Sequence, residues 1–304
     1  MPCRSVRILF AWVLLFVALG SFDARAGKPE ALKDAQALRA EGRYAEALVR
    51  ARAALAQSEA ELGERHPATA RVLSTLGRVL MALSRLAEAE PVLTRALEIR
   101  EAALDPDHPD TAESVHVLGL LRVEQGRYED AVPLHRRALA TREKVFGPDH
   151  PAVAESLSAS AELARFRGQL TEAARLYKRS LEIREEKLGE GHPDIAESLG
   201  GLALVRLEQG SSERAEALYR RSLEIREAAL GPQHPDFAKS QHNLGVILLS
   251  IGHRREAERL LTEAHDRWLA NLGPDHIAIA HVHWSVRNAS AKAEALRGGP
   301  GALS

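Results

Sequence analysis

A single period governs this sequence, because the dipeptide His-Pro returns every 42 residues, at positions 66, 108, 150, 192 and 234. His276 keeps the same spacing without the proline. Residues 108–149 and 192–233 are identical at 22 of 42 positions, and no insertion or deletion interrupts the five periods. Self-similarity at a fixed period of this length is typical of arrays in which each repeat is one supersecondary unit. We therefore expect the chain to fold as a stack of similar units.

Each period contains the signals of two helices. Proline suits the first helical position, where its missing N–H is not needed, and it disfavours helical geometry in the preceding histidine. Apolar residues then follow at helical spacing until Gly126 ends the first helix of the unit that starts at His108. A second helix is predicted from Tyr128 to Phe146, before Gly147. Most other units carry glycine where Gly126 stands, and Ser84 is the exception.

Composition agrees with an all-helical fold. Ala, Leu, Glu and Arg, which favour helices, dominate, whereas aromatic residues make up only 4% of the chain. With 45% hydrophobic residues the chain has enough apolar surface to fold, which argues against disorder. The formal net charge of −1 provides no basic field for nucleic acid.

Small residues recur at one phase of each helix. They are expected where helix axes approach closely. No helix pair can bury its whole apolar face alone, so neighbouring units must stack into an α-solenoid. The positions are Gly77, Gly119, Ala161, Ala203 and Gly245 in the first helices, and Ala89, Ala131, Ala173, Ala215 and Ala257 in the second.

The pattern Leu-Gly, then Gly-x-Tyr-x-x-Ala, then Ala-Leu resembles the tetratricopeptide repeat. The 42-residue period, with Leu-Glu-Ile-Arg-Glu at 97–101, 181–185 and 223–227 and a following Leu-Gly-x-x-His-Pro, is similar to the kinesin light chain subclass. The resemblance covers roughly residues 30–290. It implies a right-handed superhelical α-solenoid of helix pairs, whose first helices line a concave surface where peptides bind.

The predicted organisation has four parts. Residues 1–26 are read as a signal peptide, and residues 27–275 as the repeat array, with units starting near 29, 66, 108, 150, 192 and 234. A helix over 276–297 is expected to cap the open end of the stack, and 298–304 to form a flexible tail.

The amino-terminal segment has the three-part layout of a secretory signal. Arg4 and Arg7 precede an uncharged apolar run over 8–19, and Ala24-Arg25-Ala26 has the small-x-small form. Twelve helical residues rise about 18 Å, which is too short for a hydrocarbon core of roughly 30 Å. Retention as an anchor remains the alternative. The lone cysteine, Cys3, lies in this segment, so cleavage leaves no thiol for a disulfide, a zinc site or a nucleophile.

The residues that most invite a chemical role favour structural interpretations. Metal ions need several nitrogens within about 2.1 Å of one point, and histidines one whole repeat apart cannot converge that way. We expect the repeated histidines at the helix starts, where they contact the loop or the backbone. Glu-Arg runs such as Arg184-Glu185-Glu186 are interpreted as solvated helix faces. Gly200-Gly201 either permits close packing or widens the groove.

The resemblance places inner-facing residues on the first helices. Of the paired asparagines that the subclass carries there, only Asn243 remains. Glu113, Glu155 and Glu197 occupy one inner position of three successive units and form an acidic row. This row beside an apolar stripe predicts a partner peptide that is both basic and apolar. Pairing of the glutamates with nearby arginines, such as Arg122, Arg165 and Arg206, is the alternative. The predicted groove residues are Glu113, Glu155, Glu197, His116, Leu120, Glu124, Glu162, Phe166, Leu204, Glu208, His242, Asn243 and Val246.

These features predict a non-catalytic scaffold of the cell envelope, periplasmic or secreted, that binds a protein or an extended peptide. A self-associating structural subunit is the alternative, and an enzyme the less favoured one, because the sequence contains no recognised catalytic motif. No cofactor, metal, nucleic-acid partner or membrane span after signal cleavage is expected.

The signal interpretation predicts that the mature protein begins at Gly27. Intact-mass spectrometry of protein recovered from the envelope fraction of expressing cells checks this. Recovery of a chain that keeps Met1 in the membrane pellet would contradict it.

Overall fold

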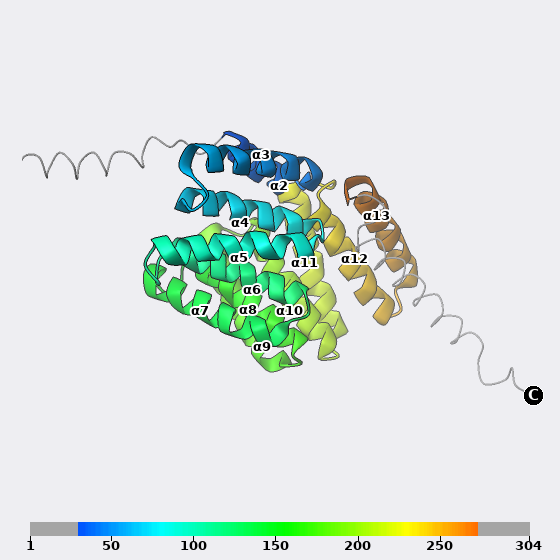
Figure 1. Ribbon diagram of the computed structural model, residues 1–304. Helices are drawn as coiled ribbons and strands as arrows, with labels where there is room; N and C mark the ends of the chain where they lie inside the picture. The colour runs from blue at the N-terminus through cyan, green and yellow to red at the C-terminus, as the bar shows by residue number, and fades with distance from the viewer. Residues whose placement is uncertain (1–29, 273–304) are drawn as a thin grey trace, which may run out of the picture.

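The computed structural model describes residues 30–272, and within them the chain forms twelve α-helices and no strand. Consecutive helices pack in antiparallel pairs, so the all-α solenoid is confirmed (Figure 1). The predicted signal peptide (1–26), capping helix (276–297) and tail (298–304) lie outside the described residues. In chain order the helices are α2 (Glu30–Ala40), α3 (Tyr44–Leu62), α4 (Pro67–Ala82), α5 (Leu86–Ala103), α6 (Pro109–Glu124), α7 (Tyr128–Phe146), α8 (Pro151–Phe166), α9 (Leu170–Leu188), α10 (Pro193–Glu208), α11 (Ser212–Leu230), α12 (Pro235–Ser250) and α13 (Arg254–Leu272).

The repeated histidines cap the first helices. In each case Nδ1 accepts a hydrogen bond from the backbone N–H two residues later, at 3.1–3.2 Å. This satisfies one of the N–H groups that a helix start leaves without an intrahelical partner. The expected position at the helix start is confirmed for His66, His108, His150, His192 and His234, whereas His276 lies outside the described part of the chain.

The turn inside each helix pair needs a left-handed residue. Gly42, Gly126, Gly168, Gly210 and Gly252 take φ values between 72° and 88°, which cost glycine nothing. Ser84 adopts φ 57° at the same place in the second unit. The turns therefore have one geometry throughout the described array.

Small residues do mark the closest approaches. A Cβ added to Gly77 would lie 2.3 Å from a Leu93 methyl group, so only glycine lets α4 and α5 pack as they do. At Gly201 a Cβ would lie 2.2 Å from the Tyr177 ring, which shows that this glycine serves close packing between α9 and α10. The alanines at the equivalent phase of the second helices are fully buried.

The first helices face the inside of the curve. From α2 through α4, α6 and α8 to α10 they contact one another directly from unit to unit, besides packing on their own second helices. Elements that touch at every step lie on the shorter, inner side of a curved stack. The concave side is thus formed by first helices, as the resemblance implies.

An arginine at one phase of the second helices lies between units, and in the second, fourth and fifth units it is the arginine of the Leu-Glu-Ile-Arg-Glu motif. Arg226, the last of them, is half-buried. Arg100, Arg142 and Arg184 are only 2–3% exposed, which corrects the interpretation of Arg184 as part of a solvated face. Charge pattern alone did not show that this position faces the next unit. Each arginine donates to a serine fourteen residues later on the next first helix, at 2.6–2.8 Å: Arg100 to Ser114, Arg142 to Ser156, Arg184 to Ser198 and Arg226 to Ser240.

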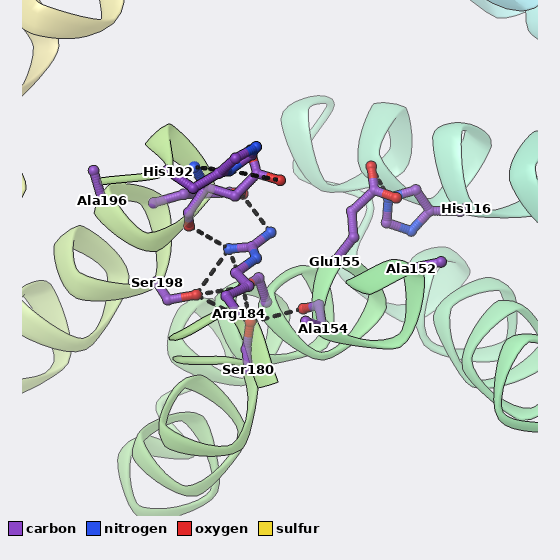
Figure 2. A network of polar contacts seen from close by, with 12 residues as sticks. His116, Ala152, Ala154, Glu155, Ser180, Arg184, His192, Ala196 and Ser198 are labelled. Carbon is purple, nitrogen blue, oxygen red and sulfur yellow. Dashed lines mark hydrogen bonds and ion pairs between the residues drawn. The ribbon is translucent and has the colours of Figure 1, made fainter. Parts of the chain in front are cut away.

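Arg184 shows how the guanidinium joins two units (Figure 2). Its Nη1 donates to Ser158 Oγ in its own unit at 3.2 Å, and to Ser198 Oγ and the Asp194 carbonyl of the next unit at 2.8 Å each. Its Nη2 pairs with Glu197 at 2.8 Å. Because the N–H donors of a guanidinium are fixed in one plane, such a bridge sets the spacing and the angle between neighbouring units.

The stack curls until its first unit meets its sixth. Nε2 of His234, at the start of α12, lies 3.0 Å from the carbonyl oxygen of Ala40, at the end of α2. In Figure 1 the blue α2 accordingly lies beside the yellow α12, although 194 residues separate the two contacting positions.

We expect Arg184→Met to lower the free energy of unfolding by roughly 2–4 kcal/mol, because buried hydroxyl, carbonyl and carboxylate groups lose their donor. Arg175→Met is the matched control, since Arg175 is 62% exposed and, within the described part of the chain, pairs only with Glu172 on its own helix. It should cost less than about 0.5 kcal/mol. Urea unfolding followed by circular dichroism measures both, and equal losses would contradict the bridging role.

Candidate functional site

The concave face, defined as the inner surface of α4, α6, α8, α10 and α12, carries the predicted groove residues. Its centre is an ionic network. Arg78 of α4 pairs with Glu113 of α6 and lies 3.6 Å from Glu155 of α8. Arg142 reaches in from α7 and pairs with both glutamates, at 3.0 Å in the case of Glu155.

This network holds its carboxylates ionised. Burial by itself would raise the pKa of Glu155, but His116, Arg78 and Arg142 together hold that pKa well below its usual value. Burial also opposes ionisation of Glu113, and Arg78 and Arg142 lower its pKa despite the nearby Glu155. Both glutamates therefore stay charged while their charge is neutralised from within the protein.

The third member of the predicted acidic row is neutralised as well, since Glu197 pairs with Arg184. The partners of the row are thus Arg78, Arg142 and Arg184. The arginines that the sequence suggested have other partners: Arg122 binds Glu90, Arg165 binds Glu208, and Arg206 donates to Gln209.

Two buried histidines stand behind the network. His116 is fully buried, with Nε2 3.3 Å from a Glu155 oxygen, so it offers no surface to a ligand (Figure 2). His135 of α7 is 2% exposed, and its ring centroid lies 6.0 Å from that of His116. Its ring nitrogens have no hydrogen-bond partner among the described residues. Burial, with lesser effects of His116 and Arg142, lowers the pKa of His135 to about 3.

Two carboxylates of the concave face remain without an ion pair. Glu124 ends α6, and Glu162 lies on α8, and neither forms a hydrogen bond or ion pair with a described residue. Glu124 is exposed to solvent, yet protein surrounds it on the inside of the curve, and this burial raises its pKa to about 7. Lys239, across the curve on α12, lowers this pKa, and Glu162 raises it.

Apolar side chains lie beside these carboxylates. Leu120, Leu204 and Val246 are half-buried at one phase of three first helices. Phe166 is 41% exposed and stacks on Tyr128, with ring centroids 5.3 Å apart. They form an interrupted apolar stripe along the inner surface.

The last two predicted positions lie on α12. His242 is half-buried, with its ring 5.4 Å from that of Trp268. Asn243 donates a hydrogen bond to the Tyr219 hydroxyl at 2.9 Å, so its amide is already engaged. The structure thus brings Glu124, Glu162 and Phe166 together as the surface that remains available, and it places His116 in the interior.

No group of three or more His, Cys, Asp or Glu side chains within residues 30–272 could hold a metal ion. Over the same residues no helix has both the length and the apolar character that a membrane span requires.

The paired helices, with first helices on the concave side, define the class of helical-repeat scaffolds. A tetratricopeptide repeat sequence profile matches residues 31–102, 73–144, 115–186, 157–228 and 194–270. These matches span most of the sequence, and the chain belongs to the tetratricopeptide repeat family. Arrays of this family generally mediate protein–protein interaction and are typically non-catalytic.

Solved structures with kinesin light chain-like repeats are similar to the chain. Nearly identical TPR-like repeats of kinesin light chain type from Podosopora anserina are 26% identical, with a TM-score of 0.51 over 67% of this chain and 97% of that one. BtubC (BKLC) from P. vanneervenii is 20% identical, with a TM-score of 0.55 over 77% and 93%, which shows the shared fold. No curated protein matches the chain.

We expect His135 to make the protein sensitive to acid. Because the folded state keeps His135 neutral down to pH about 3, only the unfolded chain takes up this proton below its ordinary pKa of about 6.5. The free energy of unfolding should therefore fall between pH about 6.5 and 3, by up to about 1.4 kcal/mol per pH unit for this group.

Urea titrations at several pH values measure this dependence. His135→Leu copies the residue found at two of the equivalent positions, Leu93 and Leu261, and should flatten the dependence. His253→Leu, at an exposed histidine, should leave the slope unchanged. A His135→Leu variant as acid-sensitive as the wild type would contradict the assignment.

Proposed function

We propose that the protein is an exported, non-catalytic scaffold that binds an extended, basic and apolar protein segment along the concave face. One observation carries this proposal: Glu124 and Glu162 lie on the concave face with no ion-pair or hydrogen-bond partner among residues 30–272, beside the exposed ring of Phe166.

The electrostatics favour a cationic ligand at this place. The pKa of Glu124 is raised to about 7 because surrounding protein and Glu162 disfavour its ionised form, and Lys239 compensates only in part. A lysine or arginine from a partner would supply the missing positive charge. Concave walls of low dielectric focus such a field and speed the encounter with ligands of opposite charge.

The apolar stripe supplies the second part of the affinity. Burying Phe166, Leu204 and Val246 against a partner removes apolar surface from water, a gain that needs little directional matching. An aromatic ring with an adjacent carboxylate suits a segment in which basic and apolar side chains alternate.

The paired glutamates have a structural role in this proposal. Substitution of Glu113, Glu155 or Glu197 would leave buried arginines without their counter-charge, so such variants would lose stability before they revealed ligand preference. The carboxylates that report on binding are those without an internal partner.

Export is the second part of the proposal and rests on the sequence. The basic start, the short apolar run and the Ala24-x-Ala26 pattern support secretion to the periplasm or beyond the cell. Such a location would bring the scaffold into contact with envelope or secreted proteins.

We expect the double variant Glu124→Gln/Glu162→Gln to bind a fluorescent peptide of alternating lysine and leucine about tenfold more weakly at low salt, a loss of about 1.4 kcal/mol. Glu182→Gln/Glu224→Gln is the matched control, because it removes the same charge from exposed positions on second helices. Fluorescence anisotropy at two salt concentrations measures both. Equal binding by the two double variants, or tighter binding of an acidic peptide, would refute the basic preference.

The same peptide should bind more weakly as the pH falls from 8 to 6. Glu124, with a pKa of about 7, is mostly ionised at the higher pH and mostly protonated at the lower one. Isothermal titration calorimetry in buffers of different ionisation enthalpy should show proton release on binding near pH 7. The double variant should lose this pH dependence, and its persistence there would assign it to another group.

A further inference from the structure

The contact between the first and sixth units, here called the seam, is made by the turn between α2 and α3 and by the start of α12. His234 caps α12 through Nδ1 as the other repeat histidines cap their helices, so its neutral ring carries the proton on Nε2. That N–H donates to the carbonyl oxygen of Ala40 at 3.0 Å. His234 is buried in consequence, whereas the four described equivalents are half-buried or exposed.

Gly42 is fitted to the seam. A Cβ built on Gly42 would lie 2.4 Å from Cδ of Pro235, and its φ is 76°. Gly210 occupies the same place in its own unit with φ 78°, and nothing lies within 4 Å of a Cβ built there. The two glycines share the backbone constraint, and they differ in the contact across the seam.

The seam is built unlike the contacts within the stack. Apolar clusters join the first unit to the second and third, and the fifth unit to the sixth. Beside the seam lies an open polar pocket of about 310 Å³, lined by Arg39, Tyr44 and Asp236 and also by Asp194 and Glu197 of α10. A polar contact with no apolar cluster across it among residues 30–272 can separate without exposing much apolar surface.

The seam also stands over the concave face. Arg39, in the last turn of α2, is close enough to Arg78, Glu155 and Asp236 for their charges to act on its pKa, which burial lowers. Arg39 therefore links the central network of the concave face to the start of α12. A chain segment moving sideways into the curve would have to pass this point.

We propose that the seam is a latch whose opening admits an extended segment to the concave face. This inference rests on the proposed function and specifies how that site is regulated. Closed, the latch joins the first unit to the sixth and blocks the sideways entry of a chain segment into the curve, although solvent reaches Glu124 and Phe166. Open, the array spreads along its length, while the arginine bridges between successive units stay intact.

Two matched pairs of variants separate the latch from its local geometry. Gly42→Ala introduces the clash with Pro235, and Gly210→Ala introduces the same backbone strain without it. His234→Asn keeps a helix-capping side chain but is too short to reach Ala40. His192→Asn makes the same change at a cap away from the seam.

The opening is measured as a distance between spin labels in a Cys3→Ser background. Labels at Val49→Cys on α3 and Glu258→Cys on α13 occupy exposed positions on the first and sixth units. Gly42→Ala and His234→Asn should shift the distance distribution to longer values, and their controls should match the wild type. Distributions that coincide within both pairs would overturn the latch, and the two pairs keep the test valid should one seam variant fail to fold.

Binding of the lysine–leucine peptide tests whether the latch controls access to the concave face, a role called the gate below. A wild type that is open about one-tenth of the time would show an apparent affinity about tenfold weaker than its open form. The two seam variants should therefore bind up to about tenfold more tightly than their controls. Longer distances without tighter binding would overturn the gate and leave the proposed function standing, provided that Glu124→Gln/Glu162→Gln still weakens binding by the wild type.

A cross-linked form tests the opposite case, in which the latch is held closed. Glu41→Cys and Gln233→Cys flank the seam on exposed positions and can be joined by a short bismaleimide, again without Cys3. The closed form should associate with the peptide much more slowly than the same variant with blocked thiols. Equal rates would overturn the gate. Absence of binding in wild type and seam variants alike would refute the proposed function and the gate together.

Discussion

The arginine that joins each unit from the second onward to the next, at positions 100, 142, 184 and 226, is the interaction on which the rest of this structure depends. A helix pair cannot bury both of its apolar faces, so stability is a matter of neighbour contacts. Apolar packing supplies the driving force, but it is non-directional. The guanidinium of Arg184, held by Ser158 and Ser198 on two successive first helices, adds direction because its donors are fixed in one plane. Repetition of one bridge with one spacing produces a regular curve.

The same bridges determine what the concave face can do. Arg142 and Arg184 reach the inner surface from second helices and neutralise Glu155 and Glu197, which would otherwise form an acidic row. Charge available to a partner is thereby confined to carboxylates beyond their reach, of which Glu124 is the clearest. Its pKa is raised to about 7 because the carboxylate, although solvent reaches it, is surrounded by protein on the inside of the curve. Paired glutamates such as Glu155 and Glu197 thus stabilise the array, whereas Glu124 is left for recognition of a partner.

The curvature brings the first unit into contact with the sixth, and this contact is more polar than the contacts between units that are adjacent in sequence. Units adjacent in sequence share apolar clusters and, from the second unit onward, an arginine bridge. The first and sixth units instead meet through His234 and Gly42, beside a polar pocket. A weak closing contact in an otherwise strongly joined array is the natural place for the array to open. The seam also uses a histidine that caps the first helix in each unit from the second to the sixth, so the contact adds no special residue type to the repeat.

Sequence by itself determined the unit: the 42-residue period, the helix start at each His-Pro, the left-handed turn residue and the close approaches at glycine and alanine. These are local rules, in which spacing along the chain and allowed backbone geometry decide the outcome. Tertiary structure alone decided which charges meet. Arg184 reads as a surface residue in a Glu-Arg run, but its phase turns it toward the next unit, where it is 2% exposed. The ion pairs of the acidic row, the burial of His116 and the contact between His234 and Ala40 depend on the angle between units. That angle is summed over six repeats, and no local pattern encodes it.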